Sequence, residues 1–176
     1  ASFATSYQRV AVTGVLGSAQ TDAALGDALA VAAALSLTSG ALVVNDTLDV
    51  VGDVRLGVSG ALAVNATLSA GGDVDATASG AMTVAASVAL SGSAKVLDLK
   101  AQSFTMAQGT SVSSTNGAMR IETTGTGVAG GLTVESINAG TAAIALVSTG
   151  SITDLDEKSL ITASALWLDA DLGIGQ

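Results

Sequence analysis

The sequence predicts an all-β fold, a right-handed parallel β-helix of stacked coils of about 20 residues each. Residues 39–98 contain three copies of a 20-residue unit, which begin Ser39-Gly40-Ala41-Leu42, Ser59-Gly60-Ala61-Leu62 and Ser79-Gly80-Ala81-Met82. The first two copies agree at 11 of 20 positions, and a fixed period of this length indicates a solenoid. Within each copy, apolar residues alternate with small or polar ones, which is the period of half-buried strands. Nearly half of the chain is hydrophobic and only 2% is aromatic, a composition that suits closely stacked strands.

Each regular unit is expected to form three short strands separated by turns. In the first unit the apolar positions are 42 and 44, 48 and 50, and 54, 56 and 58. Gly40 and Gly52 stand at the breaks, where a positive φ costs glycine little. Stacked coils pair strand to strand in parallel, about 4.8 Å apart. We therefore expect Leu42, Leu62 and Met82 to form one inward column.

Other folds fit the repeat less well. No helix of crossover length separates the strands, which disfavours a βαβ fold, and turns at strict 20-residue spacing disfavour an antiparallel sandwich. Right-handedness follows the general rule for parallel connections. The sequence leaves open whether the cross-section has two sides or three.

The first part of the chain is less regular than the repeat. Residues 1–24 are expected to form an atypical end coil, in which Phe3 and Tyr7 either cap the solenoid or pack in an ordinary coil. The alanine-rich residues 25–38 have helix propensity. However, Ala34–Gly40 aligns with the corresponding residues 54–60, so we interpret this segment as an eroded copy of the unit.

Residues 99–176 continue the solenoid as irregular coils. Phe104 and Met106 are the next inward pair, residues 123–131 form a wide turn, and a charged loop leaves the coil at residues 154–159. Trp167 lies between two inward positions, so it should point outward or cover an apolar patch beside that loop. The whole chain, 1–176, is predicted to be a single domain of roughly eight coils, on the order of 40 Å long.

Composition excludes several function classes. The chain has no histidine or cysteine, which excludes the usual zinc, haem and Ser-His or Cys-His chemistries. The net charge of −9 argues against nucleic acid and anionic membranes as partners, because both require a basic patch. No apolar run is long enough to span a bilayer, so no membrane insertion is expected. The chain has neither a starting Met nor a signal-peptide pattern, which suggests a mature product or a fragment.

Two polar pairs recur at equivalent positions of adjacent coils. Asn45 and Asn65 should form an amide ladder. Asp53 and Asp73 should bring two carboxylates together at one turn, which is the beginning of a calcium site, since hard cations require several oxygens. The alternative is a pair of solvated turn aspartates. No other cofactor is expected.

A second acidic cluster, Asp154, Asp156 and Glu157, could hold a metal or form an ordinary charged loop. Asp169 and Asp171 are expected to face water. Scattered basic residues and a single Trp disfavour a polysaccharide-cleaving enzyme, and the short Thr ladder disfavours ice binding. We therefore expect no catalytic activity.

The part of the chain that begins near residue 130 resembles a known family. The segments are Gly130-Gly131-Leu132-Thr133-Val134-Glu135-Ser136-Ile137-Asn138-Ala139-Gly140, Gly150-Ser151-Ile152-Thr153-Asp154 and Ile161-Thr162-Ala163-Ser164-Ala165-Leu166. They are similar to the repeats of large bacterial exoproteins of the filamentous haemagglutinin type. The resemblance implies a secreted, surface-exposed β-helical rod involved in adhesion, biofilm or contact-dependent functions.

Two functions follow as expectations. The first is a non-catalytic shaft segment of a secreted bacterial surface adhesin, whose host-cell or matrix ligand is bound by other parts of a longer chain. The second is a self-assembling subunit of an extracellular filament or sheath, in which copies join end to end by β-strand pairing.

Overall fold

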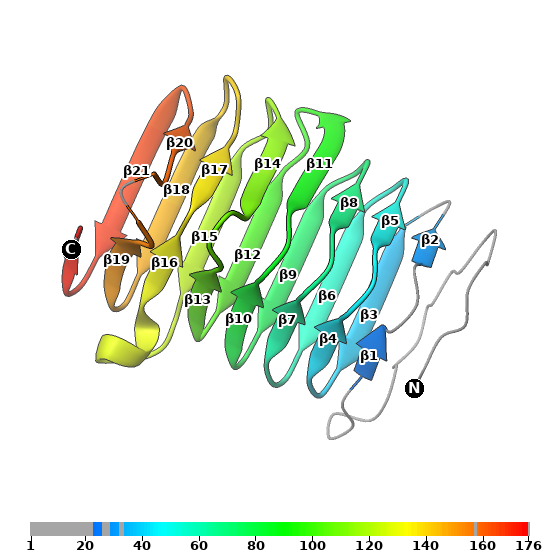
Figure 1. Cartoon of the computed structure of the whole chain (residues 1–176), viewed down its shortest axis with the longest axis horizontal. Coiled ribbons are helices and arrows are strands. Elements are labelled where there is room, and N and C mark those ends of the chain that lie inside the picture. Colours follow the sequence, from blue (N-terminus) through cyan, green and yellow to red (C-terminus); the bar gives the residue numbers. More distant parts are fainter. Residues whose placement is uncertain (1–22, 26–28, 32–33, 157, 176) are drawn as a thin grey trace.

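The chain forms a three-sided parallel β-solenoid (Figure 1). The computed structural model describes residues 23–25, 29–31, 34–156 and 158–175. Within them, 22 strands form three sheets, and neighbouring strands pair in parallel. The prediction of an all-β parallel solenoid is confirmed, and the three sheets settle the cross-section.

The strands follow one another from sheet to sheet in chain order. The first sheet contains β1 (Ala23–Leu25), β4 (Leu42–Val44), β7 (Leu62–Val64), β10 (Ala81–Val84), β13 (Ser103–Met106), β16 (Leu132–Val134), β19 (Ser151–Asp154) and β22 (Gly173–Ile174). The second contains β2 (Leu29–Val31), β5 (Leu48–Val50), β8 (Leu68–Ala70), β11 (Val88–Ser93), β14 (Ser111–Thr115), β17 (Ser136–Asn138) and β20 (Ile161–Thr162). The third contains β3 (Leu35–Ser39), β6 (Val54–Val58), β9 (Val74–Ala78), β12 (Leu97–Ala101), β15 (Met119–Thr123), β18 (Ala143–Ser148) and β21 (Ala165–Ala170).

The turns differ in length although the strands stay in register. Leu42, Leu62 and Met82 pair at the constant spacing of the repeat, and the turn from Met82 to Phe104 is slightly longer. The turn from Phe104 to Leu132 is the longest of the column, because the 3-10 helix η1 (Gly127–Gly130) is inserted before β16. The coils are of about 22 residues, over about six turns. The sequence indicates roughly eight coils, more than the about six turns found among the described residues.

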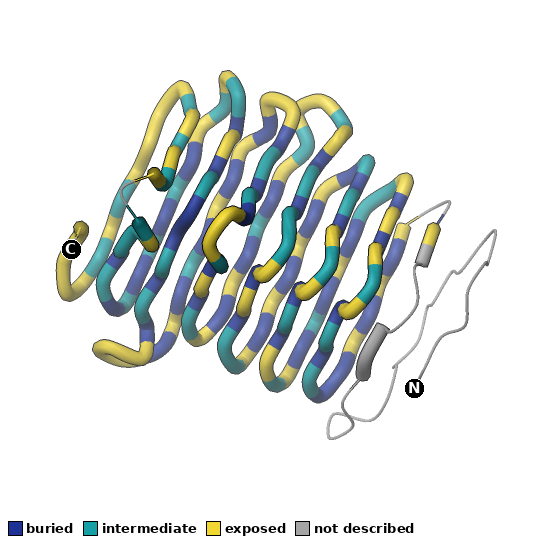
Figure 2. The backbone as a smooth tube through the Cα atoms, viewed as in Figure 1, coloured by how far each residue is buried: buried dark blue, intermediate teal, exposed yellow. Residues whose placement is uncertain are grey.

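The core is a set of apolar columns along the solenoid axis. Leu42, Leu62, Met82 and Phe104 are each no more than 1% exposed, which confirms the inward column that the repeat predicts. Figure 2 shows the consequence, an alternation of buried and exposed residues along the strands of the regular turns. Fully burying one such side chain contributes about 1.5–3 kcal/mol. Continuous columns are therefore the main stabilising feature of the rod.

The register of β3 corrects one detail of the sequence alignment. Leu35, and not Ala34, pairs with Val54. Leu35 is buried, while Ala34 is exposed. A slip of one residue would turn every side chain of the strand to the other face. β3 therefore takes the register that buries its leucines. The small residues around Leu35 do not by themselves indicate this register.

Glycine at the turns serves a purpose different from the predicted one. Neither Gly52 nor its counterpart Gly72 has a positive φ. Instead, a Cβ at Gly72 would lie 2.5 Å from the backbone nitrogen of Asp53 in the preceding turn. The turns stack so closely that a side chain does not fit, and this close approach is what requires glycine.

Most of the end coil predicted for residues 1–24, with Phe3 and Tyr7, lies outside the described residues. Among the residues that are described, no helix is long and apolar enough to cross a membrane.

Candidate functional site

The structure brings Asp53 and Asp73 together at one corner of adjacent turns. The backbone N–H of Asp73 donates a 2.9 Å hydrogen bond to Oδ1 of Asp53. Asp73 repeats the contact, because its Oδ1 accepts from the backbone N–H of Val96 at 2.9 Å. Each carboxylate thus satisfies a backbone donor of the next turn. Calcium binding at this corner stays a prediction, and the ladder is a second, structural role for the same residues.

The predicted amide ladder is present. The side-chain amide of Asn65 donates a 2.9 Å hydrogen bond to Oδ1 of Asn45. Both side chains are exposed, so the bond stabilises the stacking of adjacent turns modestly.

The loop after β19 is fastened by Asp156 to the loop after β13, two turns earlier. Oδ2 of Asp156 accepts a 3.0 Å hydrogen bond from the Gln108 side-chain amide. Its Oδ1 accepts from the backbone N–H of Lys158 at 2.8 Å. These hydrogen bonds, the one from Gln108 above all, lower the pKa of Asp156 below its ordinary value. Glu157, the third member of the predicted cluster, lies outside the described residues.

Glu135 lies beneath this loop and was not predicted from the sequence to be a site residue. It is only 7% exposed. Its Oε1 accepts from the backbone N–H of Gly109 at 3.2 Å, and its Oε2 lies 3.4 Å from the hydroxyl of Ser159. The carboxylate therefore ties together loops from three successive turns. Over the described ranges, no group of three or more His, Cys, Asp or Glu side chains is arranged to hold a metal.

A cluster of four charged side chains lies on the outer face of the third sheet. Asp98 pairs in register with Arg120, and Lys100 with Glu122, on the adjacent strands β12 and β15. Lys100 Nζ lies 3.0 Å from Glu122 Oε1, and the Arg120 guanidinium contacts Glu122 and lies 3.8 Å from Asp98. One oxygen each of Asp98 and Glu122 is buried without a geometrically good hydrogen bond, and these ion pairs are what compensate them.

The environment of Glu122 stabilises its charged form. The hydrogen bond from Lys100 is the largest effect and lowers the pKa of Glu122, and the charges of Arg120 and Lys100 act in the same direction. Partial burial opposes them. The two positive and two negative charges of the cluster cancel.

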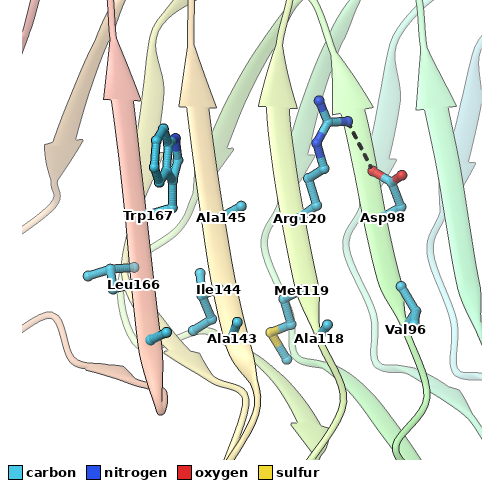
Figure 3. Close-up of a pocket in the computed structure, with 11 residues that line it drawn as sticks. Val96, Asp98, Ala118, Met119, Arg120, Ala143, Ile144, Ala145, Leu166 and Trp167 are labelled. Carbon is cyan, nitrogen blue, oxygen red and sulfur yellow. Dashed lines mark ion pairs between the residues drawn. The ribbon is translucent and has the colours of Figure 1, made fainter.

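Beside this cluster lies a pocket of about 430 Å³ on the same sheet face (Figure 3). Trp167, Ala145, Arg120 and Asp98 are register neighbours on β21, β18, β15 and β12. Figure 3 shows them in one row, with Ala145 between the indole and the guanidinium. We call the space between Trp167 and Arg120, with Ala145 as its floor, the Trp167 slot. Further alanines extend the floor, namely Ala118, Ala143 and Ala165.

Trp167 is 66% exposed. It points outward, as the alternation predicts. Asp169 and Asp171 are exposed as well, as expected. No sequence motif links the residues of the slot, because they come from turns of unequal length. The exposed Trp and the run of small residues were the signals that could have indicated it.

The fold and the ladders define the class of protein: an all-β parallel β-solenoid. No protein-family model, no curated protein and no solved structure matches the chain.

Proposed function

We propose that the chain is a non-catalytic segment of the shaft of a secreted bacterial surface adhesin or exoprotein. The observation that carries this proposal is the continuity of the three sheets. From β4 to β21, each strand pairs in parallel with the strand one turn earlier. Such a rod gains length by adding turns, because each turn packs mainly against its neighbours.

The resemblance of residues 130–175 to exoprotein repeats supports the same function. It also supports a secreted or bacterial cell-surface location. A host-cell or matrix ligand is then bound by other parts of a longer chain, while this segment sets the distance between them. Neither nucleic acid nor the membrane interior is a partner in this proposal.

The test is an in-frame deletion of one turn, residues 59–78, in the full-length protein on bacteria. Because Met82 would then take the place of Leu62 next to Leu42, the inward columns stay in register. We expect surface display and adhesion to persist, with the shaft shorter by about 4.8 Å. A matched deletion of residues 59–68 removes half a turn and should abolish display. Loss of adhesion from the one-turn deletion, with display intact, would contradict a purely structural role.

A second function is favoured by one observation. Large apolar side chains of the β19–β22 turn are exposed, namely Leu166 at 47%, Leu172 at 56% and Ile174 at 55%. A second copy that stacks on this turn by parallel strand pairing would cover them, giving an extracellular filament.

Electron microscopy and sedimentation of the purified chain separate the two functions. The filament function requires the purified chain to form regular fibres. Leu166→Asp should prevent fibre formation. The control variant Trp167→Ala, which changes the outer face, should not. A monomer at all concentrations would exclude the filament and leave the shaft.

A further inference from the structure

The Trp167 slot has the dimensions of a site for one six-membered ring. Strands β15 and β21 lie two strand spacings apart, about 9.6 Å. A ring in contact on both faces needs about 7–8 Å between its two walls, at ordinary carbon contact distances. The pocket volume, about 430 Å³, lies in the range of about 300–1,000 Å³ typical of small-molecule sites. Both walls and the floor belong to described strands.

The surfaces of the slot differ in chemistry. The Trp167 indole and the methyl group of Ala145 are apolar, whereas Arg120 and Asp98 place a half-exposed ion pair at the other side. A ligand that fits must have an apolar face and hydrogen-bonding groups at its edge. A pyranose ring has this combination, since its axial C–H bonds cover one face and its hydroxyls surround it.

The charges indicate an uncharged ligand. Arg120 is opposed by Asp98 and Glu122, and Glu122 by Lys100. The chain as a whole carries a net charge of −9, which disfavours polyanions such as nucleic acid or acidic polysaccharides. Neither a cation nor an anion would therefore gain much from the slot.

We infer that the Trp167 slot binds a ring of a neutral saccharide. This goes beyond the shaft role, because it gives the rod wall a ligand of its own. Only two side chains flank the ring and the pocket is open to solvent. We therefore expect a Kd for a single ring on the order of 1 mM.

The experiment uses the whole 176-residue chain. Trp167 is its only tryptophan, so tryptophan emission, excited where tyrosine does not absorb, reports on this site alone. The probes are the methyl glycosides of glucose, galactose, mannose and N-acetylglucosamine, titrated to about 50 mM. Saturation-transfer NMR with the same probes gives a second readout that does not depend on the indole.

We expect a saturable change in Trp emission, and transfer to ring protons, for at least one probe. Ala145→Leu fills the slot while keeping the indole, and should weaken binding at least tenfold. Ala63→Leu, the same change at an outward position of the first sheet, should leave binding unaltered. Trp167→Ala should abolish saturation transfer. Thermal melts followed by circular dichroism establish that each variant is folded.

Three results would overturn the inference. One is the absence of both signals for all four glycosides. Another is undiminished binding by folded Ala145→Leu. The third is binding of an aromatic probe such as p-cresol without binding of any glycoside, which would assign the slot to an aromatic side chain of a protein partner. None of these results bears on the shaft, whose test is the one-turn deletion.

Discussion

The backbone N–H of Asp73 donates a 2.9 Å hydrogen bond to Oδ1 of Asp53, which stands one turn earlier in the chain. The bond joins two turns at a corner, beside the backbone hydrogen bonds from the Gly72 N–H to the Gly52 carbonyl and from the Val54 N–H to the Asp73 carbonyl. Asp53→Ala should lower the free energy of unfolding by about 1 kcal/mol, since it removes one acceptor. Asp53→Asn keeps a side-chain oxygen and should cost less than half of that. Urea unfolding measures both, and equal losses from the two variants would contradict the ladder.

Calcium binding is the other role predicted for the corner at Asp53 and Asp73. One oxygen of each carboxylate already accepts a backbone N–H, and two carboxylates fall short of the six to eight oxygen ligands that calcium takes. A Tm that is the same in calcium and in chelator would rule out the calcium site predicted at Asp53 and Asp73. A rise in Tm with calcium that disappears in the double variant Asp53→Asn, Asp73→Asn would instead establish the site that the sequence predicts.

Two glycines should respond to alanine in opposite ways. At Gly72 the new Cβ would meet the backbone of the preceding turn at 2.5 Å, so the turns must separate. We expect a loss of about 1–3 kcal/mol. At Gly57, in the middle of β6, the nearest atom is 3.8 Å away, and alanine should stabilise the strand by about 0.5–1 kcal/mol.

Paired thermal and urea unfolding of these two variants measures the contrast. If Gly72→Ala were as stable as the parent chain, the turns could not be stacked as closely as the structure has them. If Gly57→Ala lost as much stability as Gly72→Ala, glycine at position 57 would be required for a reason other than the conformation of β6.

Glu122 predicts how stability depends on pH. Its pKa is lowered below the ordinary value of 4.5, chiefly by the hydrogen bond from Lys100. A depressed pKa means that the ion pairs contribute fully above about pH 4.5 and that their contribution is lost as the pH falls through the lower, folded-state value. Glu122→Gln should therefore reduce stability at pH 7 and flatten its decline between about pH 5 and pH 2.

Asp169→Asn is the control for this variant, because it removes an exposed carboxylate from the same sheet face. It should leave the pH profile nearly unchanged. An identical profile for Glu122→Gln and the parent chain would show that the ion pairs of Lys100 and Arg120 do not stabilise the fold.

Much of the fold follows from the sequence because the repeat fixes register. Leu42, Leu62 and Met82 recur at a constant spacing, so their burial can be predicted without coordinates. Phe104 could still be assigned to the same inward column, because Met106, two residues later, is also apolar and continues the alternation. Leu35 could not, because small residues on both sides of it leave the alignment poorly determined.

The candidate sites were harder to predict than the core. Glu135 is buried by loops of three different turns, and the insertion of η1 makes the spacing of these turns irregular. Arg120, Ala145 and Trp167 each stand one full turn apart in the chain, and those turns differ in length, so no motif connects them. Their proximity is a property of the strand register alone.

Distances between spin labels along the first sheet test the central claim most directly. The chain has no cysteine, so labels can be placed at Val43, Thr105, Thr133 and Thr153, which are outward neighbours in one row. A parallel solenoid predicts that the distance from position 43 to positions 105, 133 and 153 rises in equal steps of about 4.8 Å, from about 14 to about 24 Å. The steps stay equal although the turn from Thr105 to Thr133 contains the η1 insertion and the turn from Thr133 to Thr153 does not. Distances that instead grow with sequence separation, or that are broadly distributed, would contradict the stacked turns.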